Sequence, residues 1–169
     1  MSNKIFLVGM PGSGKTYWGK VIAAMKGIPF IDLDEYIESR EQKSISEFFK
    51  EHDEKVFREI ENAFLADIIE ANEGDIVIAC GGGTPCYKDN MNLMKNNGVV
   101  IYLKADVSFL MERLKGHIDK RPLLAAHTDI EDRLKQLLNE RSAIYEQADH
   151  ILQVDYITAI TFDEILRNV

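Results

Sequence analysis

The stretch IFLVGMPGSGKT, residues 5–16, places a short apolar run directly before a glycine-rich loop. Its second part fits the pattern G-x-x-x-x-G-K-[ST], and the segment that follows repeats apolar residues at helical spacing. Glycines allow the backbone to fold around an anion with its N–H groups pointing inward, and the positive end of a helix adds to the attraction. The stretch therefore predicts a strand, a phosphate-binding loop and a helix.

Four further apolar runs predict the remaining strands of a sheet, at residues 29–33, 76–80, 99–103 and 151–154. Strands that are apolar throughout and alternate with helices are typical of a parallel sheet covered on both faces. We therefore expect an α/β fold, a three-layer α/β/α arrangement with a five-stranded parallel sheet. Over residues 115–128, glycine, proline and basic residues interrupt the helical pattern, which predicts a mobile lid.

Length and composition bound the class of protein. A chain of 169 residues and 19.2 kDa fits one compact domain over residues 1–169. The net charge of -8 and the pI near 5.0 argue against nucleic acid and anionic membranes as partners, because both would be repelled. The apolar run Ile5–Met10 is too short for a signal peptide or a membrane span. Cys80 and Cys86 match the spacing of neither a zinc site nor a redox pair, which favours reduced thiols in a cytoplasmic protein.

The phosphate-binding loop assigns roles to its last residues. Lys15 can reach the β- and γ-phosphates of a nucleotide, and Thr16 offers a neutral oxygen to Mg²⁺, which keeps most of its water ligands. We predict that a nucleotide is bound by the residues Gly12, Ser13, Gly14, Lys15, Thr16 and Tyr17. The loop alone leaves open whether the protein is a GTPase, an ATPase or a kinase.

Two acids, Asp32 and Asp34, follow the second predicted strand, at the edge where doubly wound sheets bind their ligands. Acids separated by one residue point to different sides of an extended chain and can serve different partners. We predict that Asp32 supports the hydration shell of Mg²⁺ and that Asp34 contacts an acceptor hydroxyl. The alternative is that the acids cap the N-terminus of a helix over residues 35–40.

Arg58 and Glu61 are i, i+3 neighbours on a predicted helix. They lie off the apolar stripe that this helix shows at i, i+4 spacing, formed by Val56, Ile60, Phe64 and Ile68. Taken alone, the two charged residues indicate an ion pair at the surface. After the third predicted strand, the triplet Gly81–Gly83 suggests a backbone that a ligand approaches closely, with a flexible turn as the alternative.

Two arginines in the second half of the chain are further candidates. Arg141 falls near the centre of an apolar helical arc, where a guanidinium needs either a protein carboxylate or a ligand carboxylate as its partner. Position on the helix does not distinguish these two partners. Arg121, in the predicted lid, could stabilise a phosphoryl group during transfer, or be an ordinary solvated arginine.

Taken together, these motifs resemble those of the shikimate kinase family, and the resemblance spans nearly the whole chain. Six segments agree in order and spacing: GMPGSGKT at 9–16, DLD at 32–34, FREIE at 57–61, GGG at 81–83, RPLL at 121–124 and ERSAIY at 140–145. The resemblance implies an enzyme that transfers the γ-phosphate of Mg-ATP to the 3-hydroxyl of shikimate, in the pathway to chorismate and the aromatic amino acids. It also implies a monomer.

The resemblance assigns roles to single residues. Arg58, Arg141 and the loop Gly81, Gly82 and Gly83 would bind shikimate, and Asp34 would contact its ring hydroxyls. Arg121 would contact the ATP phosphates and Arg113 would stack on the adenine. The catalytic residues would be Lys15, Asp34 and Arg121, and the metal site would include Thr16 and Asp32. For Arg141, the resemblance favours a ligand carboxylate.

Two other functions remain to be distinguished. Another small-metabolite kinase of the same fold, such as a gluconate kinase, also accepts an anionic polyol. A nucleotide-dependent binding module that has kept the phosphate loop without turnover belongs to a different class. A panel of acceptors would separate these three functions.

Overall fold

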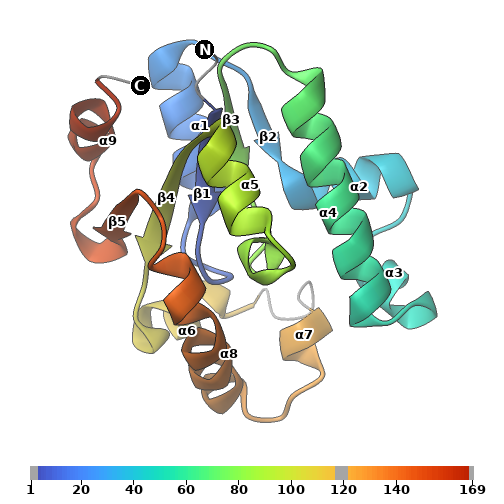
Figure 1. The fold of residues 1–169 in the computed structure, drawn as a ribbon. Helices are drawn as coiled ribbons and strands as arrows, with labels where there is room; N and C mark the ends of the chain where they lie inside the picture. Colours follow the sequence, from blue (N-terminus) through green and yellow to red (C-terminus); the bar gives the residue numbers. More distant parts are fainter. Residues whose placement is uncertain (1–3, 117–121, 168–169) are drawn as a thin grey trace.

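The computed structural model describes residues 4–116 and 122–167. Within these residues, five parallel strands form one sheet in the order β2-β3-β1-β4-β5 (Figure 1). The strands are β1 (Lys4–Val8), β2 (Phe30–Asp32), β3 (Ile76–Ala79), β4 (Gly98–Lys104) and β5 (His150–Gln153). Helices flank the sheet on both sides, so the predicted three-layer α/β/α fold with a five-stranded parallel sheet is confirmed.

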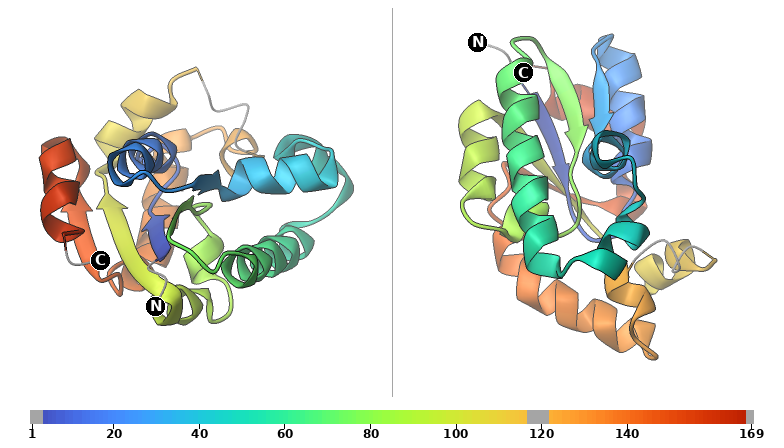
Figure 2. Two further views of the ribbon diagram at one scale, coloured as in Figure 1. Left: turned by 90° about the horizontal axis from the view of Figure 1, so that it is seen from above. Right: turned by 90° about the vertical axis from the view of Figure 1, so that its right-hand side faces the viewer.

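The helices divide between the two faces of the sheet. α1 and α9 contact each other on one face, while α4 and α5 lie on the other (Figure 2). The described helices are α1 (Lys15–Lys26), α2 (Leu33–Glu41), α3 (Ile45–Glu51), α4 (Glu54–Ala71), α5 (Asn90–Asn97), α6 (Val107–Leu114), α7 (Pro122–Ala125), α8 (Ile130–Tyr145) and α9 (Ala159–Ile165), with the 3-10 turns η1 (Thr84–Cys86) and η3 (Val154–Tyr156). In the described part of the chain, no helix is both long enough and apolar enough to cross a membrane.

Strand β1 lies at the centre of the sheet and is buried along its whole length. Phe6 is fully buried and pairs in register with Ile78 of β3 and Val100 of β4. Because helices cover both faces of the sheet, both sets of side chains on this strand face apolar surroundings. The strand is therefore a rigid support for the phosphate-binding loop that follows it.

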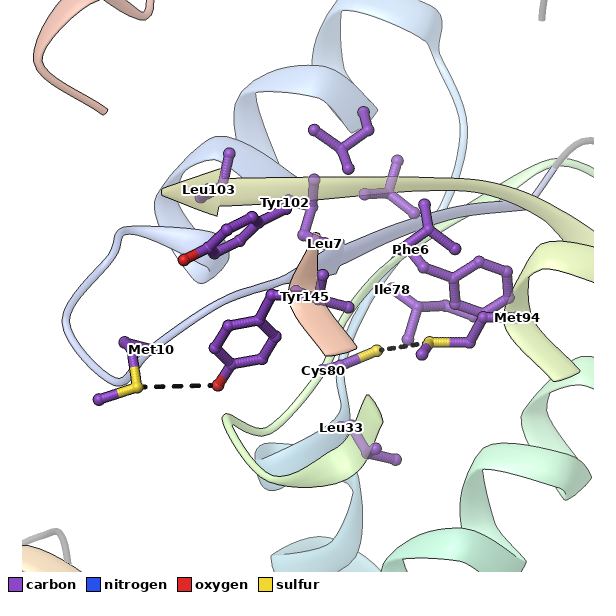
Figure 3. Close-up of a cluster of buried hydrophobic side chains, with 14 of the residues drawn as sticks. Phe6, Leu7, Met10, Leu33, Ile78, Cys80, Met94, Tyr102, Leu103 and Tyr145 are labelled. Carbon is purple, nitrogen blue, oxygen red and sulfur yellow. Dashed lines mark hydrogen bonds between the residues drawn. The ribbon is translucent and has the colours of Figure 1, made fainter. Parts of the chain in front are cut away.

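Tyr145 joins the core to the carboxyl end of the sheet (Figure 3). Its ring packs against that of Tyr102, with centroids 4.9 Å apart, and both side chains are buried. The Tyr145 hydroxyl donates to the carbonyl oxygen of Gly82 at 2.5 Å and lies 3.8 Å from the sulfur of Met10. Burial raises the pKa of Tyr145 well above its ordinary value, so the hydroxyl keeps its proton and its role as a donor.

Two sequence predictions need correction. The second strand ends at Asp32, and Leu33 already begins α2, so Asp34 lies in the first turn of a helix and not in an extended chain. The buried face of α4 agrees with the predicted stripe only in part. Ile68 is buried, Ile60 and Phe64 are partly buried against the core, and Val56 is exposed. The buried positions are Phe57, Arg58, Glu61, Leu65, Ile68 and Ile69, so the face that packs on the core is shifted to include the two charged residues.

The predicted lid is described in part. Helix α6 ends at Leu114, and α7 begins at Pro122. Residues 117–121, and with them Arg121, lie outside the described residues. Leu124 of α7 is buried, which fixes the C-terminal half of this segment to the body of the protein.

Replacing Phe6 by alanine should lower the free energy of unfolding by about 3–5 kcal/mol, because the large cavity at the centre of the sheet cannot collapse. Urea unfolding followed by circular dichroism measures the change. As a control, Ile160→Ala on the exposed face of α9 should change stability by less than about 0.5 kcal/mol. Similar losses in both variants would contradict a core centred on β1.

Candidate active site

The phosphate-binding loop connects β1 to α1, and its glycines have backbone conformations that other residues rarely adopt. Gly9, Gly12 and Gly14 have φ angles of 143°, 86° and 93°. A Cβ on Gly9 would come within 2.7 Å of the carbonyl oxygen of Leu103. Gly14 is the N-cap of α1, so the loop leads directly into the positive end of the helix.

Lys15 lies over the loop. Its ammonium group donates to the carbonyl oxygens of Gly9 and Met10, both at 2.9 Å. Ser13 is buried, and its hydroxyl has no hydrogen-bond partner within the described residues. The loop brings an ammonium group and a hydroxyl without a described partner close to the positive end of α1, a combination suited to an anion with several oxygens.

Asp32 has two partners. Its Oδ2 accepts a hydrogen bond from the Thr16 hydroxyl at 2.6 Å, and its Oδ1 accepts from the backbone N–H of Asp34 at 3.0 Å. The N-cap interpretation of Asp32 is therefore confirmed, and the same carboxylate also reaches the phosphate-binding loop. A hydroxyl beside a carboxylate fits Mg²⁺, which binds oxygen and takes few protein ligands. The described residues contain no group of three or more histidine, cysteine, aspartate or glutamate side chains placed to hold a metal ion.

A pocket of about 550 Å³, partly open to solvent, lies beside the loop at the carboxyl end of the sheet. Charged residues and apolar rings share its walls. Its lining consists of Pro11, Asp34, Ile45, Phe49, Phe57, Arg58, Glu61, Gly81, Gly82, Gly83, Leu124, Leu137 and Arg141. Every residue that the sequence assigned to an acceptor is in this set.

Arg58 is held in the wall of this pocket by two acids. Its NH1 atom lies 2.7 Å from Oε2 of Glu61, and its NH2 atom lies 3.1 Å from Oε1 of Glu54. Arg58 is 8% exposed and Glu61 is 0% exposed, so the expectation of an ion pair at the surface is wrong. Burial alone would lower the pKa of Arg58, but the carboxylates of Glu61 and Glu54 together outweigh it and the pKa is raised.

Arg141 lies across the pocket from α4 and is only 7% exposed. Its burial confirms the apolar arc seen in the sequence. In the described part of the chain, no carboxylate forms an ion pair with this guanidinium. A buried cation without a protein carboxylate is costly unless a ligand supplies the negative charge.

The glycine triplet packs directly against the charged side chains. A Cβ on Gly81 would collide with Oε1 of Glu61, and a Cβ on Gly83 would collide with the guanidinium of Arg58. A Cβ on Gly82 would lie 2.9 Å from Pro11 and 3.3 Å from NH1 of Arg141. The triplet is therefore not a flexible turn. Because its residues have no side chains, the charged groups of Glu61, Arg58 and Arg141 can pack directly against its backbone.

Two predicted ATP-binding residues lie outside the pocket. Tyr17 is 65% exposed, and its ring contacts the edge of Trp18. Arg113 is exposed near the end of α6, with its guanidinium 5.2 Å from the ring centroid of Phe109. Their predicted contacts with ATP stay predictions.

Sequence reasoning missed the apolar walls of the pocket. Phe49 lies on α3, Phe57 immediately precedes Arg58, and Leu124 and Leu137 come from α7 and α8. The rings of Phe49 and Phe57 pack together with centroids 5.0 Å apart. In the sequence, these residues look like ordinary core positions, and only the position of Phe57 beside Arg58 hints at a site.

The arrangement defines a class of protein. A phosphate-binding loop, an oxygen pair suited to Mg²⁺ and an adjoining pocket with two buried arginines are the parts of a P-loop kinase that acts on a small anionic acceptor.

Comparisons with known proteins give the family. The family model for shikimate kinase matches residues 11–169. A curated shikimate kinase from Bacteroides fragilis is 42% identical over 154 residues, which cover 90% of this chain and 85% of that protein. The chain belongs to the shikimate kinase family.

Solved structures agree in fold. The crystal structure of shikimate kinase from Bacteroides thetaiotaomicron has a TM-score of 0.89 at 35% identity, with 98% of each chain covered. Shikimate kinase from Acinetobacter baumannii, solved in complex with shikimate, has a TM-score of 0.91 at 29% identity and covers 99% of this chain and 95% of that one.

Replacing Gly83 by alanine should displace the Arg58 guanidinium and break its pair with Glu61, at a cost in folding free energy of about 2–4 kcal/mol. Gly74→Ala is a matched control, because no atom lies within 4 Å of the added methyl group. Urea unfolding compares the two variants. Equal stability of both would show that the triplet does not pack against Arg58 as described.

Proposed function

We propose that this protein transfers the γ-phosphoryl group of Mg-ATP to the 3-hydroxyl of shikimate, giving shikimate 3-phosphate and ADP on the route to chorismate and the aromatic amino acids. One observation carries the proposal most directly. Arg141 is a buried guanidinium that lines the pocket without a protein carboxylate in the described chain. Shikimate is a carboxylate that bears ring hydroxyls, so it supplies both the missing charge and the acceptor.

ATP binds at the phosphate loop in this proposal. The N–H groups of Gly12, Ser13 and Gly14 contact the phosphates, and Lys15 moves from its carbonyl partners to the phosphate oxygens. Mg²⁺, when bound, neutralises charge on the β- and γ-phosphates. The hydroxyl of Thr16 would hold it directly, and Asp32 would hold it through water, since their oxygens already lie 2.6 Å apart.

The acceptor lies in the pocket beside the loop. Arg141 and Arg58 bind its anionic and polar groups, and the bare backbone of Gly81–Gly83 lets the ring approach closely. Asp34, which lines the same pocket, orients the reacting hydroxyl and accepts its proton as the oxygen bonds to phosphorus. The bond between the γ-phosphorus and its bridging oxygen breaks, and ADP leaves.

The lid completes the site. Arg121 contacts the ATP phosphates and stabilises the charge that develops during transfer, while Arg113 stacks on the adenine and Tyr17 borders the nucleotide. Closure of residues 115–128 excludes water, which would otherwise compete as the acceptor. We further propose that residues 1–169 act as a single domain and as a cytoplasmic monomer, without nucleic acid or membrane partners, in line with a net charge of -8.

ADP release from Mg-ATP should be stimulated by shikimate and not by gluconate, by nucleoside monophosphates or by buffer alone. A coupled assay with purified protein measures it. Stimulation by gluconate would indicate another metabolite kinase of the same fold, and would require new roles for Arg58 and Arg141. No stimulation by any acceptor would favour a nucleotide-dependent binding module.

Replacing Arg141 by methionine, which keeps much of the volume, should raise the KM for shikimate about 100-fold, because a charged hydrogen-bonding partner is lost. The KM for ATP should change less than about twofold, since the phosphate loop is untouched. The methyl ester of shikimate provides a control, because it lacks the charge that Arg141 recognises. The KM for the ester should therefore differ little between the variant and the unaltered protein. An equal loss for shikimate and its ester would place the carboxylate elsewhere.

A further inference from the structure

Thr84 lies in the turn η1, directly after the glycine triplet, and does not line the pocket. Its side chain is 0% exposed. The hydroxyl donates to Oε1 of Glu61 at 2.6 Å, while Oε2 of the same carboxylate accepts from Arg58 at 2.7 Å. Glu61 therefore connects a buried hydroxyl on one segment to the guanidinium that faces the acceptor on another.

The Glu61 carboxylate depends on this hydroxyl. It is fully buried, so each of its oxygens needs a donor from the protein. Within the described residues, the side chains that donate to it are those of Arg58 and Thr84. Without the threonine hydroxyl, Oε1 would be a buried charged oxygen with no side-chain donor among the described residues, and the carboxylate would turn toward Arg58.

Glu54, the other acid that contacts Arg58, cannot replace Glu61 in orienting the guanidinium. Glu54 lies 3.1 Å from the guanidinium, but its side chain is 45% exposed. An ion pair in water fixes a side chain weakly, because solvent screens it and competes for its hydrogen bonds. The orientation of Arg58 toward the pocket therefore rests mainly on Glu61.

Thr84 is itself fixed in place by asparagines. Its carbonyl oxygen accepts from Nδ2 of Asn90 at 2.9 Å, and Oδ1 of Asn90 accepts from Nδ2 of Asn62 at 3.1 Å. Asn62 follows Glu61 on α4, so the chain of hydrogen bonds leaves α4 and returns to it. The backbone N–H of Thr84 also donates to the carbonyl oxygen of Gly81 at 3.2 Å. The hydroxyl has little freedom to move.

We propose that Thr84 is a positioning residue for the acceptor, acting through Glu61 on Arg58. This inference rests on the proposed function, in which Arg58 binds the acceptor. The threonine touches neither substrate, and its hydroxyl sets the direction of the guanidinium that does. Its removal weakens acceptor binding and leaves the nucleotide site as it is, because the hydrogen bonds described above for this network run between α4, Gly81, η1 and α5.

Steady-state kinetics of Thr84→Val, which keeps the shape and removes the hydroxyl, tests the proposal. The KM for shikimate should rise about tenfold, while the KM for ATP and kcat stay within about twofold. Thr84→Ser, which restores the donor, should return the KM for shikimate to near the value of the unaltered protein. Thr161→Val, which removes a hydroxyl from α9, is the matched control and should have no effect on either KM. Thr84→Ala replaces the valine variant if that protein does not fold.

A merely structural role gives a different result. Equal changes in both KM values, or a serine variant that behaves like the valine variant, would overturn the proposal.

A double-mutant cycle separates this inference from the proposed function. Urea unfolding of Thr84→Val, Arg58→Lys and the double variant should show losses that do not add, although the two side chains share no hydrogen bond, because both act on Glu61. Additive losses would overturn the positioning role, whatever the acceptor is. Coupled losses in a protein that shikimate does not stimulate would instead overturn the proposed function, and the kinetic comparison would then use the acceptor that does stimulate.

Discussion

A fully buried carboxylate needs neighbouring groups that balance its charge, and Glu61, in the wall of the pocket, is such a carboxylate. Its two oxygens determine the neighbours: an arginine on one side and a hydroxyl on the other. The same carboxylate also excludes any side chain at Gly81. Helix α4 and the stretch 81–84 are thus adapted to one buried charge, and the pocket takes its shape from them.

The protein binds two anionic substrates in spite of its net charge of -8. It does so by concentrating positive charge at the carboxyl end of the sheet, where the loop before α1, Lys15 and two buried arginines lie. Low dielectric walls made by aromatic and aliphatic side chains strengthen these charges relative to those on the surface. The electrostatic field in the site and the net charge of the whole protein are therefore separate properties, and the composition alone predicts only the net charge.

Sequence patterns predicted the sheet well, because each strand contains consecutive apolar residues and the phosphate-binding loop has a strict spacing of glycines. They also placed Arg141 in an apolar arc, which the structure confirms. Patterns were only partly right at α4, where Arg58 and Glu61 pair with each other and are buried together, so that the buried face of the helix is shifted from the predicted stripe. Thr84 carried no signal at all, since its importance lies in a contact with a residue 23 positions away. The positions of Tyr17, Arg113 and Arg121 relative to ATP depend on a bound state that local patterns do not encode.

Asp32 divides its two oxygens between a helix and a loop, and this division limits what evolution can place there. Oδ1 accepts a hydrogen bond from the backbone N–H of Asp34 in the first turn of α2 at 3.0 Å. Oδ2 accepts one from the Thr16 hydroxyl at 2.6 Å. Glutamate, with one more methylene group, carries the same charge but cannot present both oxygens from the same backbone position. Asparagine keeps the shape but offers only one acceptor. Aspartate is thus fixed here by geometry on two sides, because the same few atoms cap a helix and join it to the phosphate-binding loop.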